Sequence, residues 1–321
     1  LFLIALGTIY AVTGTLNMAD LAQKLPTLPE GDTALIRAAA VILRRFQPQL
    51  VFGVGGYVTG PVLIAARVLG IPVCIHEQNS VPGLANRMVS RLADRIFLSI
   101  PCAYRFPGHR TVLVGNPVRR EIREAAGGRA PGSGREAHIL ILGGSQGAHR
   151  VNMLVTEAAR QVSEKLGGRV RFTHQTGRAD LEEVRARYHR LGIKAEVQDF
   201  FADMAAVYSR ADLAVSRAGA TTLAELAVMG LPAILLPYPF AADNHQQSNG
   251  AYYEQGGAAR MFLEKDLDGE KLAGEILHLV ENPEMLHQMS ARMQELARPD
   301  AAERIIDECL QLIEKKQAQK A

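Results

Sequence analysis

The chain has 321 residues, of which 48% are hydrophobic and 21% charged. This composition supports a sizeable buried core and excludes global disorder. The 36 Lys and Arg against 33 Asp and Glu leave a net charge of +3, whereas nucleic-acid binding calls for a clustered basic face. The three cysteines, Cys74, Cys102 and Cys309, are far apart, which indicates reduced thiols rather than a disulfide framework or a metal site.

Residues 1–12 are apolar, but they lack the basic region of a signal peptide and the length of a membrane span. Apolar runs that end in polar or glycine-rich turns then recur, each followed by helical periodicity. The clearest runs are Leu50–Val54, Ile71–Ile75, His138–Leu142, Leu213–Ser216 and Ala233–Pro237. Buried strands alternating with helices predict parallel sheets with right-handed crossovers. The polar turns fall at the carboxyl ends of the strands, where such sheets bind their ligands.

The segment Glu124–Glu136 is rich in Gly, Pro and Ser, which is typical of a linker. It separates two predicted α/β domains, residues 1–123 and 137–299. Residues 300–321, after Pro299, have the apolar periodicity of a helix. The residues expected on its apolar face are Ile305, Ile306, Cys309, Leu312 and Ile313.

The stretch VSRAGATTLAEL, residues 215–226, is predicted to end a strand and to begin a helix near Thr221 or Thr222. The N–H groups at a helix N-terminus, together with nearby hydroxyls, suit a pyrophosphate. Glu225, one turn further on, can accept two hydrogen bonds from a ribose diol. The same spacing also satisfies a capping box, Thr222-x-x-Glu225, so local chemistry leaves both interpretations open.

Two further turns are rich in glycine: GGSQGAH at Gly143–His149 and GVGGYVTGP at Gly53–Pro61. Glycines let a ligand approach the backbone closely. The first turn matches neither the dinucleotide fingerprint nor a P-loop. A tight structural turn is the alternative there.

The sequence HEQN, His76 to Asn79, follows a predicted buried strand. Such a polar cluster is costly unless it is exposed in a cleft or fully hydrogen-bonded. His76 and Glu77 are therefore candidates for proton transfer, and Asn79 for binding a sugar hydroxyl or amide. For a single histidine at a strand end, a structural role is the usual alternative.

The stretch Ala241–Asn249 (AADNHQQSN) offers donors and acceptors that match sugar hydroxyls, although a solvated helix start has the same composition. Metal chemistry has weaker support, because the nine histidines show no HExxH or His-x-His spacing. Asp266 and Asp268 form an Asp-x-Asp pattern just before a predicted helix, so helix capping is the favoured interpretation. We expect no metal ion or other cofactor.

Six motifs follow one another in a specific order: GGYVTGP, HEQNSVPG, GNPVR (Gly115–Arg119), GGSQGA, RAGATTLAE and the DNHQ–SN stretch. In this order the chain resembles the MurG family within glycosyltransferase family 28. The resemblance covers roughly residues 36–300. The first strand and glycine-rich loop (GTGGH) that open this family do not appear in the sequence, so an incomplete N-terminal domain is expected.

The resemblance implies a GT-B architecture, in which two Rossmann-like domains face a cleft. It also implies that the helix after Pro299 braces the N-terminal domain. Glu225 would hold the ribose, Ser145 and Arg119 would lie near the diphosphate, and Phe201 would lie beside the uracil. The complete set of positions that match the donor site is Asn79, Arg119, Ser145, Phe201, Ala220, Thr221, Thr222, Leu223, Ala224, Glu225 and Gln246.

The implied reaction is inverting transfer of N-acetylglucosamine from UDP-N-acetylglucosamine to the C4 hydroxyl of a lipid-linked muramyl-pentapeptide, in peptidoglycan synthesis. The implied location is the cytoplasmic face of the bacterial plasma membrane, with peripheral attachment and no nucleic-acid partner. Ile42, Leu43, Arg44, Arg45 and Phe46 are candidates for the membrane contact, and an ordinary amphipathic helix is the alternative. Another UDP-sugar enzyme of the same fold, such as a lipid glucosyltransferase or an epimerase, and a non-catalytic UDP-sugar-binding fragment remain as alternatives.

Overall fold

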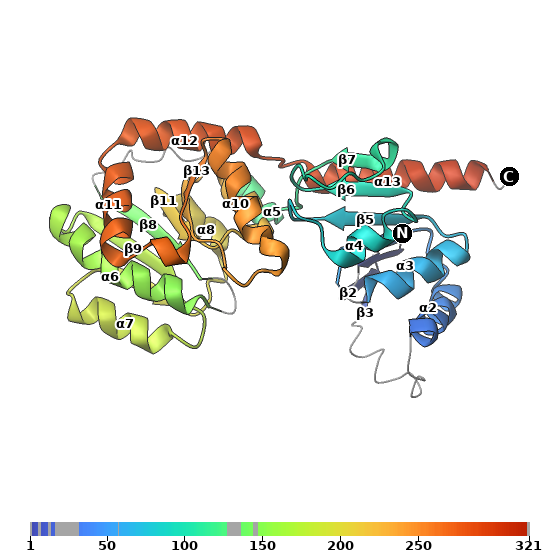
Figure 1. Cartoon of the computed structure of the whole chain (residues 1–321), viewed down its shortest axis with the longest axis horizontal. Helices are drawn as coiled ribbons and strands as arrows, with labels where there is room; N and C mark the ends of the chain where they lie inside the picture. The colour runs from blue at the N-terminus through green and yellow to red at the C-terminus, as the bar shows by residue number, and fades with distance from the viewer. Residues whose placement is uncertain are drawn as a thin grey trace. The chain divides into compact units, whose positions relative to one another are not determined.

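The computed structural model describes residues 2–5, 8–11, 14–16, 32–56, 58–126, 136–143 and 147–319. The chain forms two compact units (Figure 1). The first comprises residues 1–116 and 300–321, and the second comprises residues 117–299. The division thus falls between Asn116 and Pro117, ahead of the segment 124–136 in which the sequence placed a linker.

The first unit contains a four-stranded parallel sheet in the order β4-β5-β6-β7. Its strands are β4 (Val51–Gly53), β5 (Val73–Glu77), β6 (Arg95–Leu98) and β7 (Thr111–Leu113). Its helices are α2 (Asp32–Phe46), α3 (Thr59–Val68), α4 (Leu84–Val89), η1 (Gly108–Arg110) and α13 (Ala301–Ala318). A separate antiparallel sheet, which the sequence pattern did not predict, consists of β1 (Phe2–Ala5), β2 (Thr8–Ala11) and β3 (Gly14–Leu16).

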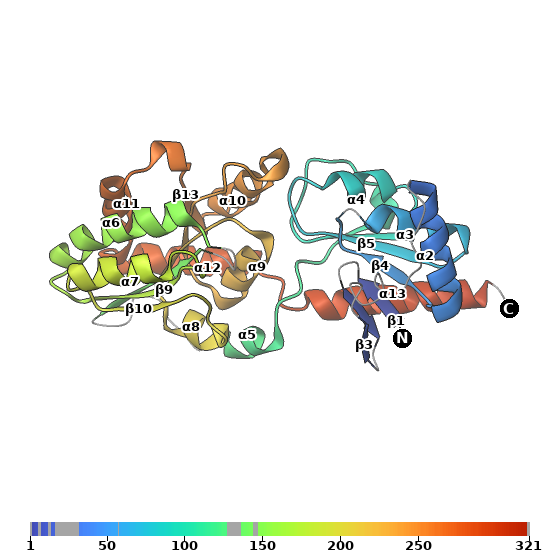
Figure 2. The ribbon, with the colours of Figure 1, turned by 90° about the horizontal axis from the view of Figure 1, so that it is seen from below.

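Both faces of the parallel sheet in the first unit are covered. One face packs against α2 and α3 through a cluster that includes Leu43, Val51 and Leu63. The other face packs against α13 (Figure 2). On the apolar side of this helix, Cys309 and Leu312 belong to a cluster with strand residues. Coverage on both faces explains why the strand sequences are continuously apolar rather than alternating.

The second unit contains a six-stranded parallel sheet in the order β10-β9-β8-β11-β12-β13. Its strands are β8 (Ala137–Leu142), β9 (Val170–Gln175), β10 (Ala195–Gln198), β11 (Leu213–Ser216), β12 (Ala233–Leu235) and β13 (Ala259–Met261). Its α-helices are α5 (Arg120–Ala125), α6 (His149–Lys165), α7 (Leu181–Arg190), α8 (Met204–Arg210), α9 (Ala220–Met229), α10 (His245–Gln255), α11 (Gly269–Val280) and α12 (Pro283–Leu296). Two short 3-10 turns, η2 (Ala242–Asn244) and η3 (Glu264–Asp266), complete it.

The two parallel units confirm the predicted pair of Rossmann-like domains. Among the described residues, no helix is both long and apolar enough to cross a membrane. Asp268 is the N-cap of α11, because its side chain accepts a hydrogen bond of 2.8 Å from the Lys271 N–H. The capping interpretation is therefore confirmed for Asp268, and Asp266 lies in η3 beside it.

Candidate functional site

The strand order of the second unit defines a switch point between β8 and β11. From β8 the chain continues outward to β9 and β10, and from β11 it continues the opposite way to β12 and β13. The register pairs Leu142 with Ser216, so these two neighbouring strands end at the same level. Parallel α/β sheets bind ligands outside the carboxyl ends of strands at such a point. Helices α6 and α9 both begin at this edge.

Glu225 is a buried charged side chain at this edge. It lies on α9 with 7% of the residue exposed. Its Oε2 accepts a hydrogen bond of 2.8 Å from the Tyr208 hydroxyl, and its Oε1 accepts one of 3.2 Å from Arg119 Nε. Burial and the adjacent Glu225 carboxylate raise the pKa of Tyr208 well above its ordinary value, so the phenol keeps its proton and acts as the donor.

This geometry decides between the two interpretations of Thr222-x-x-Glu225. Helix α9 starts one turn earlier than a capping box requires, because its N-cap is Gly219 and no side chain caps it. The Glu225 carboxylate is instead held by Tyr208 and Arg119, which come from other parts of the second unit. The capping-box alternative is therefore wrong, and the carboxylate is placed by tertiary contacts.

The remaining positions of the run 220–224 differ in accessibility. Thr221 is exposed, and Ala220, Thr222 and Ala224 are half-buried. Leu223 is 1% exposed, and its N–H already donates to the Gly219 carbonyl. The first N–H groups of a helix have no partner within it, so the predicted contact role of residues 220–222 stays a prediction. Leu223 is corrected from a contact residue to a core residue.

Phe201 is also placed differently from the expected position beside a base. Its residue is only 4% exposed, whereas its neighbour Phe200 is 56% exposed. A ring must offer an open face to stack on a base. At the end of β10 the exposed ring is that of Phe200, which the sequence reasoning did not single out because adjacent aromatics give no local sign of which one points inward.

Gln246 lies at the start of α10, and its Oε1 accepts a hydrogen bond of 3.0 Å from the Tyr238 N–H. Ser145 lies outside the described residues. Arg217, which the sequence reasoning also missed, donates to the Leu236 carbonyl at 3.0 Å and forms an ion pair with Glu264. It thereby ties together the segments that follow β11, β12 and β13.

A cavity of about 710 Å³ opens beside the start of α10. It is within the range of small-molecule sites. The predicted stretch 241–249 contributes two amide side chains to its lining, Asn244 and Gln247. Other lining residues are Arg150, Pro237, Tyr238, Pro239, Phe240, Leu263, Glu264, Lys265, Asp266, Leu267, Asp268 and Lys271.

In the first unit, His76 is buried at the end of β5. Its Nε2 lies 3.0 Å from the Gly115 carbonyl and 3.0 Å from Ser99 Oγ, and its Nδ1 lies 3.3 Å from Gln78 Nε2. The carbonyl can only accept, so Nε2 carries the proton and Nδ1 accepts from the Gln78 amide. Burial lowers the pKa of His76 to about 4, so the ring is neutral near pH 7.

Glu77 organises the loop that follows β5. Its Oε1 accepts from the Asn79 N–H at 3.0 Å, and its Oε2 accepts from the Gly83 N–H at 3.0 Å and from Asn86 Nδ2 at 2.8 Å. The side chain is buried, and its oxygens are occupied by this loop. The structure therefore corrects the proton-transfer interpretation: His76 and Glu77 shape the turn that carries Asn79.

Comparisons with known proteins agree with this architecture. The model of the glycosyltransferase family 28 C-terminal domain matches residues 138–305, and that of the N-terminal domain matches residues 8–98. The second match begins at residue 8, whereas the resemblance recognised in the sequence began near residue 36, so the family resemblance extends further toward the N-terminus than expected.

Two curated relatives carry the same name, UDP-N-acetylglucosamine–N-acetylmuramyl-(pentapeptide) pyrophosphoryl-undecaprenol N-acetylglucosamine transferase. The one from Desulfotalea psychrophila is 48% identical over 92% of this chain and 79% of its own length. The one from Geobacter sulfurreducens is 47% identical over 83% of this chain and 74% of its own length. The crystal structure of Acinetobacter baumannii MurG matches with a TM-score of 0.75 and 30% identity, over 93% of this chain and 88% of that one. A Listeria monocytogenes UDP-N-acetylglucosamine 2-epimerase structure, at 14% identity and a TM-score of 0.63, shares the fold, over 88% of this chain and 80% of that one.

Proposed function

The chain belongs to glycosyltransferase family 28, and from this premise we propose that it catalyses the reaction for which its relatives are named. In that reaction, N-acetylglucosamine passes from UDP-N-acetylglucosamine to a lipid-linked N-acetylmuramyl-pentapeptide. The observation in the structure that supports this most directly is the buried Glu225 carboxylate, held by Tyr208 and Arg119 at the switch point of the second unit.

The donor nucleotide lies at the carboxyl ends of β8 and β11. Glu225 accepts hydrogen bonds from the ribose diol, and Phe200 stacks on the uracil. The diphosphate faces the N-termini of α6 and α9, whose N–H groups and dipoles favour an anion. Arg119 uses part of its five-donor guanidinium on Glu225, which leaves other donors for the phosphates or the ribose.

The C4 hydroxyl of the muramyl acceptor attacks the anomeric carbon of the donor sugar, and the bond from that carbon to UDP breaks with inversion. Negative charge grows on the leaving diphosphate during this step. Donors already fixed in place at that position lower the barrier, because they need no reorganisation as the charge develops. We assign this stabilisation to the two helix N-termini and Arg119, without a divalent metal ion. Asn244 and Gln247, in the cavity beside α10, contact the hydroxyls of the transferred sugar.

The acceptor is carried by a lipid, and α4 of the first unit offers a surface suited to a bilayer. Leu84 and Met88 lie one turn apart on the same side of this helix and are 69% and 70% exposed. The exposed Arg91 follows Met88 closely in the sequence, and the exposed Arg105 adjoins Tyr104, whose ring lies 5.8 Å from the Arg87 guanidinium of α4. Both arginines supply charge complementary to anionic lipid headgroups. We therefore place peripheral binding to the cytoplasmic leaflet here.

The segment Ile42–Phe46, our sequence candidate for this contact, is corrected in part. Leu43 is 1% exposed and belongs to the core under the sheet. Arg44 and Arg45 are exposed, so the helix has the ordinary amphipathic pattern that was the alternative.

The reaction is tested by incubating the chain with UDP-N-acetylglucosamine and a lipid-linked muramyl-pentapeptide, and measuring both UDP release and the disaccharide product. We expect product from this donor and far less from UDP-glucose. Conversion of the donor to UDP-N-acetylmannosamine without acceptor would instead identify an epimerase, and UDP binding without either product would identify a sugar-nucleotide-binding protein.

The membrane contact is tested by co-sedimentation with vesicles that contain anionic phospholipid. The double variant Leu84→Asp/Met88→Asp should remain in the supernatant. The matched control Val41→Asp alters an equally exposed apolar residue on α2 and should sediment like the wild type. Equal sedimentation of both variants would exclude α4 as the contact.

A further inference from the structure

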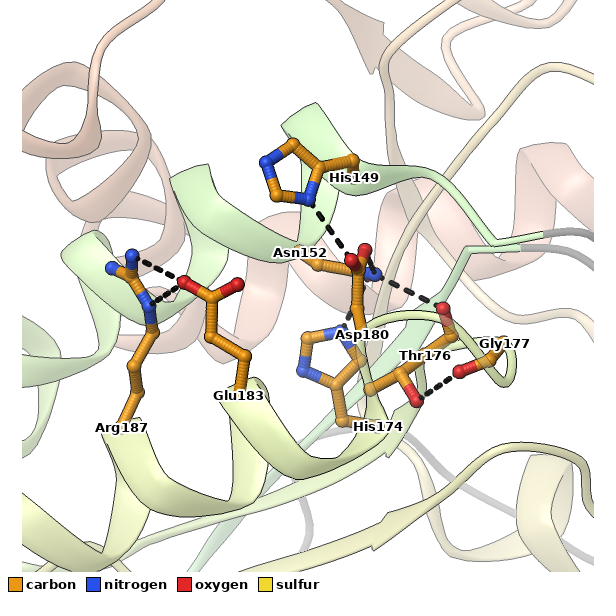
Figure 3. A network of polar contacts seen from close by, with 8 residues as sticks. All are labelled: His149, Asn152, His174, Thr176, Gly177, Asp180, Glu183 and Arg187. Carbon is orange, nitrogen blue, oxygen red and sulfur yellow. Dashed lines mark hydrogen bonds and ion pairs between the residues drawn. The ribbon is translucent and has the colours of Figure 1, made fainter.

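Outside the residues assigned above, a polar network connects the start of α6 with the end of β9 (Figure 3). His149 is the first residue of α6, and its Nδ1 lies 2.9 Å from Asp180 Oδ1. Asn152 Nδ2 donates to Asp180 Oδ2 at 2.7 Å and to the Thr176 carbonyl at 3.0 Å. His174 connects Asn152 to Tyr188 in the interior, through contacts of 3.0 Å and 3.1 Å.

Two groups in this network can accept but not donate a hydrogen bond, and they fix which atom donates in the contacts that Asn152 makes. The Asp180 carboxylate and the Thr176 carbonyl can only accept, so the amide nitrogen of Asn152 faces them and its oxygen faces His174. His174 Nε2 is therefore protonated. Burial lowers the pKa of His174 to about 3 and raises the pKa of Tyr188, so the neutral His174 ring accepts from the phenol at Nδ1.

The same logic fixes the tautomer of His149. Because Asn152 occupies one oxygen of Asp180 and the carboxylate carries no proton to give, His149 Nδ1 must be the donor to the other oxygen. The second ring nitrogen, Nε2, lies on the side of the imidazole away from Asp180 (Figure 3). The Asp180 side chain is 11% exposed, whereas the His149 side chain is 68% exposed. A buried carboxylate thus holds a surface imidazole in one tautomer and one orientation.

The position of this imidazole relates it to the donor nucleotide. The register pairs Leu142 of β8 with Gln175 on one side and with Ser216 on the other. The three strands therefore end at one level, and His149 stands at the same sheet edge as the start of α9. A cation at the N-terminus of a helix is unfavourable unless an anion lies beside it, and the carboxylate of Asp180 meets that requirement.

We propose that His149 binds the diphosphate of the donor nucleotide, with Nε2–H donating to a phosphate oxygen while Asp180 positions the ring. A histidine ring protonated at both nitrogens can donate from Nδ1 to Asp180 and from Nε2 to a phosphate oxygen, and a charged donor gives the stronger hydrogen bond to that oxygen. Glu183 also faces the pair, since ligand atoms of His149, Asp180 and Glu183 lie within 4.8 Å of one another. Arg187 Nη2 lies 2.8 Å from Glu183 Oε1 and offsets its charge. This inference rests on the proposed function, because it assumes a UDP-linked donor.

Calorimetry with UDP and with uridine tests the proposal, because only UDP carries the phosphates. His149→Gln should weaken UDP binding about tenfold and leave uridine binding unchanged. His189→Gln, which alters an exposed histidine on α7, is the matched control and should change neither affinity. Because His149 is exposed, the variant should keep the melting temperature of the wild type.

Asp180 is a positioning residue in this proposal, and nitrogen-15 NMR of the imidazole provides its separate readout. The wild type should show His149 protonated at Nδ1 in its neutral form, and Asp180→Asn should lose this preference. Equal UDP affinity in the wild type and His149→Gln would overturn the proposal. So would a UDP affinity that chelator lowers and Zn²⁺ restores, because His149, Asp180 and Glu183 would then be metal ligands. A wild type that binds neither UDP nor uridine would overturn the proposed function itself, and this inference with it.

Discussion

Replacing Glu225 separates a ribose contact from a purely structural role. The residue is 7% exposed, and its carboxylate accepts hydrogen bonds from Tyr208 and Arg119. A charged acceptor fixed in this way is worth about 1–3 kcal/mol to a diol that binds it. Glu225→Gln should therefore weaken UDP binding roughly 5- to 150-fold. Glutamine keeps an oxygen for the buried Tyr208 hydroxyl, whereas Glu225→Ala would leave that hydroxyl unpaired and cost about 1–3 kcal/mol of stability.

The assay is calorimetric titration with UDP and with 2′,3′-dideoxy-UDP. The ligand without the diol should bind Glu225→Gln and the wild type with nearly equal affinity. Tyr208→Phe is the matched control, because it removes the partner that holds Oε2 and leaves the carboxylate in place. Equal losses for both ligands in Glu225→Gln would refute the reasoning and make Glu225 a structural residue that braces α8 and α9.

Three further outcomes follow from the structure. Burial lowers the pKa values of His76 and His174 to about 4 and about 3, below the unfolded value of about 6.5. The folded protein therefore holds both rings neutral, and their contribution to the free energy of unfolding is complete above pH 6.5. This contribution is lost as the pH falls, because the unfolded chain then binds protons that the folded protein does not. The free energy of unfolding, measured in urea, should fall by about 2 kcal/mol per histidine between pH 7 and pH 5. His76→Gln should make this fall smaller. An unchanged pH dependence in the variant would contradict the assignment of the effect to the buried His76 ring. Phe200→Ala should weaken UDP binding at constant melting temperature, whereas Phe201→Ala should lower the melting temperature, and the reverse pattern would restore Phe201 as the base contact. Asp268→Ala should cost about 1 kcal/mol of stability through the lost cap. The wild type should bind UDP with equal affinity in magnesium and in chelator, whereas a tenfold drop in chelator would indicate a metal site.

Local patterns in the sequence determined five strands of the two parallel sheets (β4, β5, β8, β11 and β12), the glycine-rich turns and the family. Buried parallel strands must be continuously apolar and must end in polar turns, so the run Leu213–Ser216 and the turn after it could be placed without any tertiary contact. The cap at Asp268 was equally predictable, because its partner is the N–H of Lys271, three residues away. Contacts within one turn of the chain leave their signature in the spacing of residue types.

The roles of individual polar side chains depended on residues far away in the chain. Thr222-x-x-Glu225 has the spacing of a cap, yet Glu225 is bound by Tyr208, 17 residues away, and by Arg119, 106 residues away. The role of His76 likewise depends on a distant partner, since its Nε2 donates to the Gly115 carbonyl, 39 residues further along the chain. Spacing cannot reveal such partners, because the sheet order brings them together. The sequence therefore determined which segments carry the site, and the tertiary structure decided which side chains in those segments are held in the interior and which can reach a ligand.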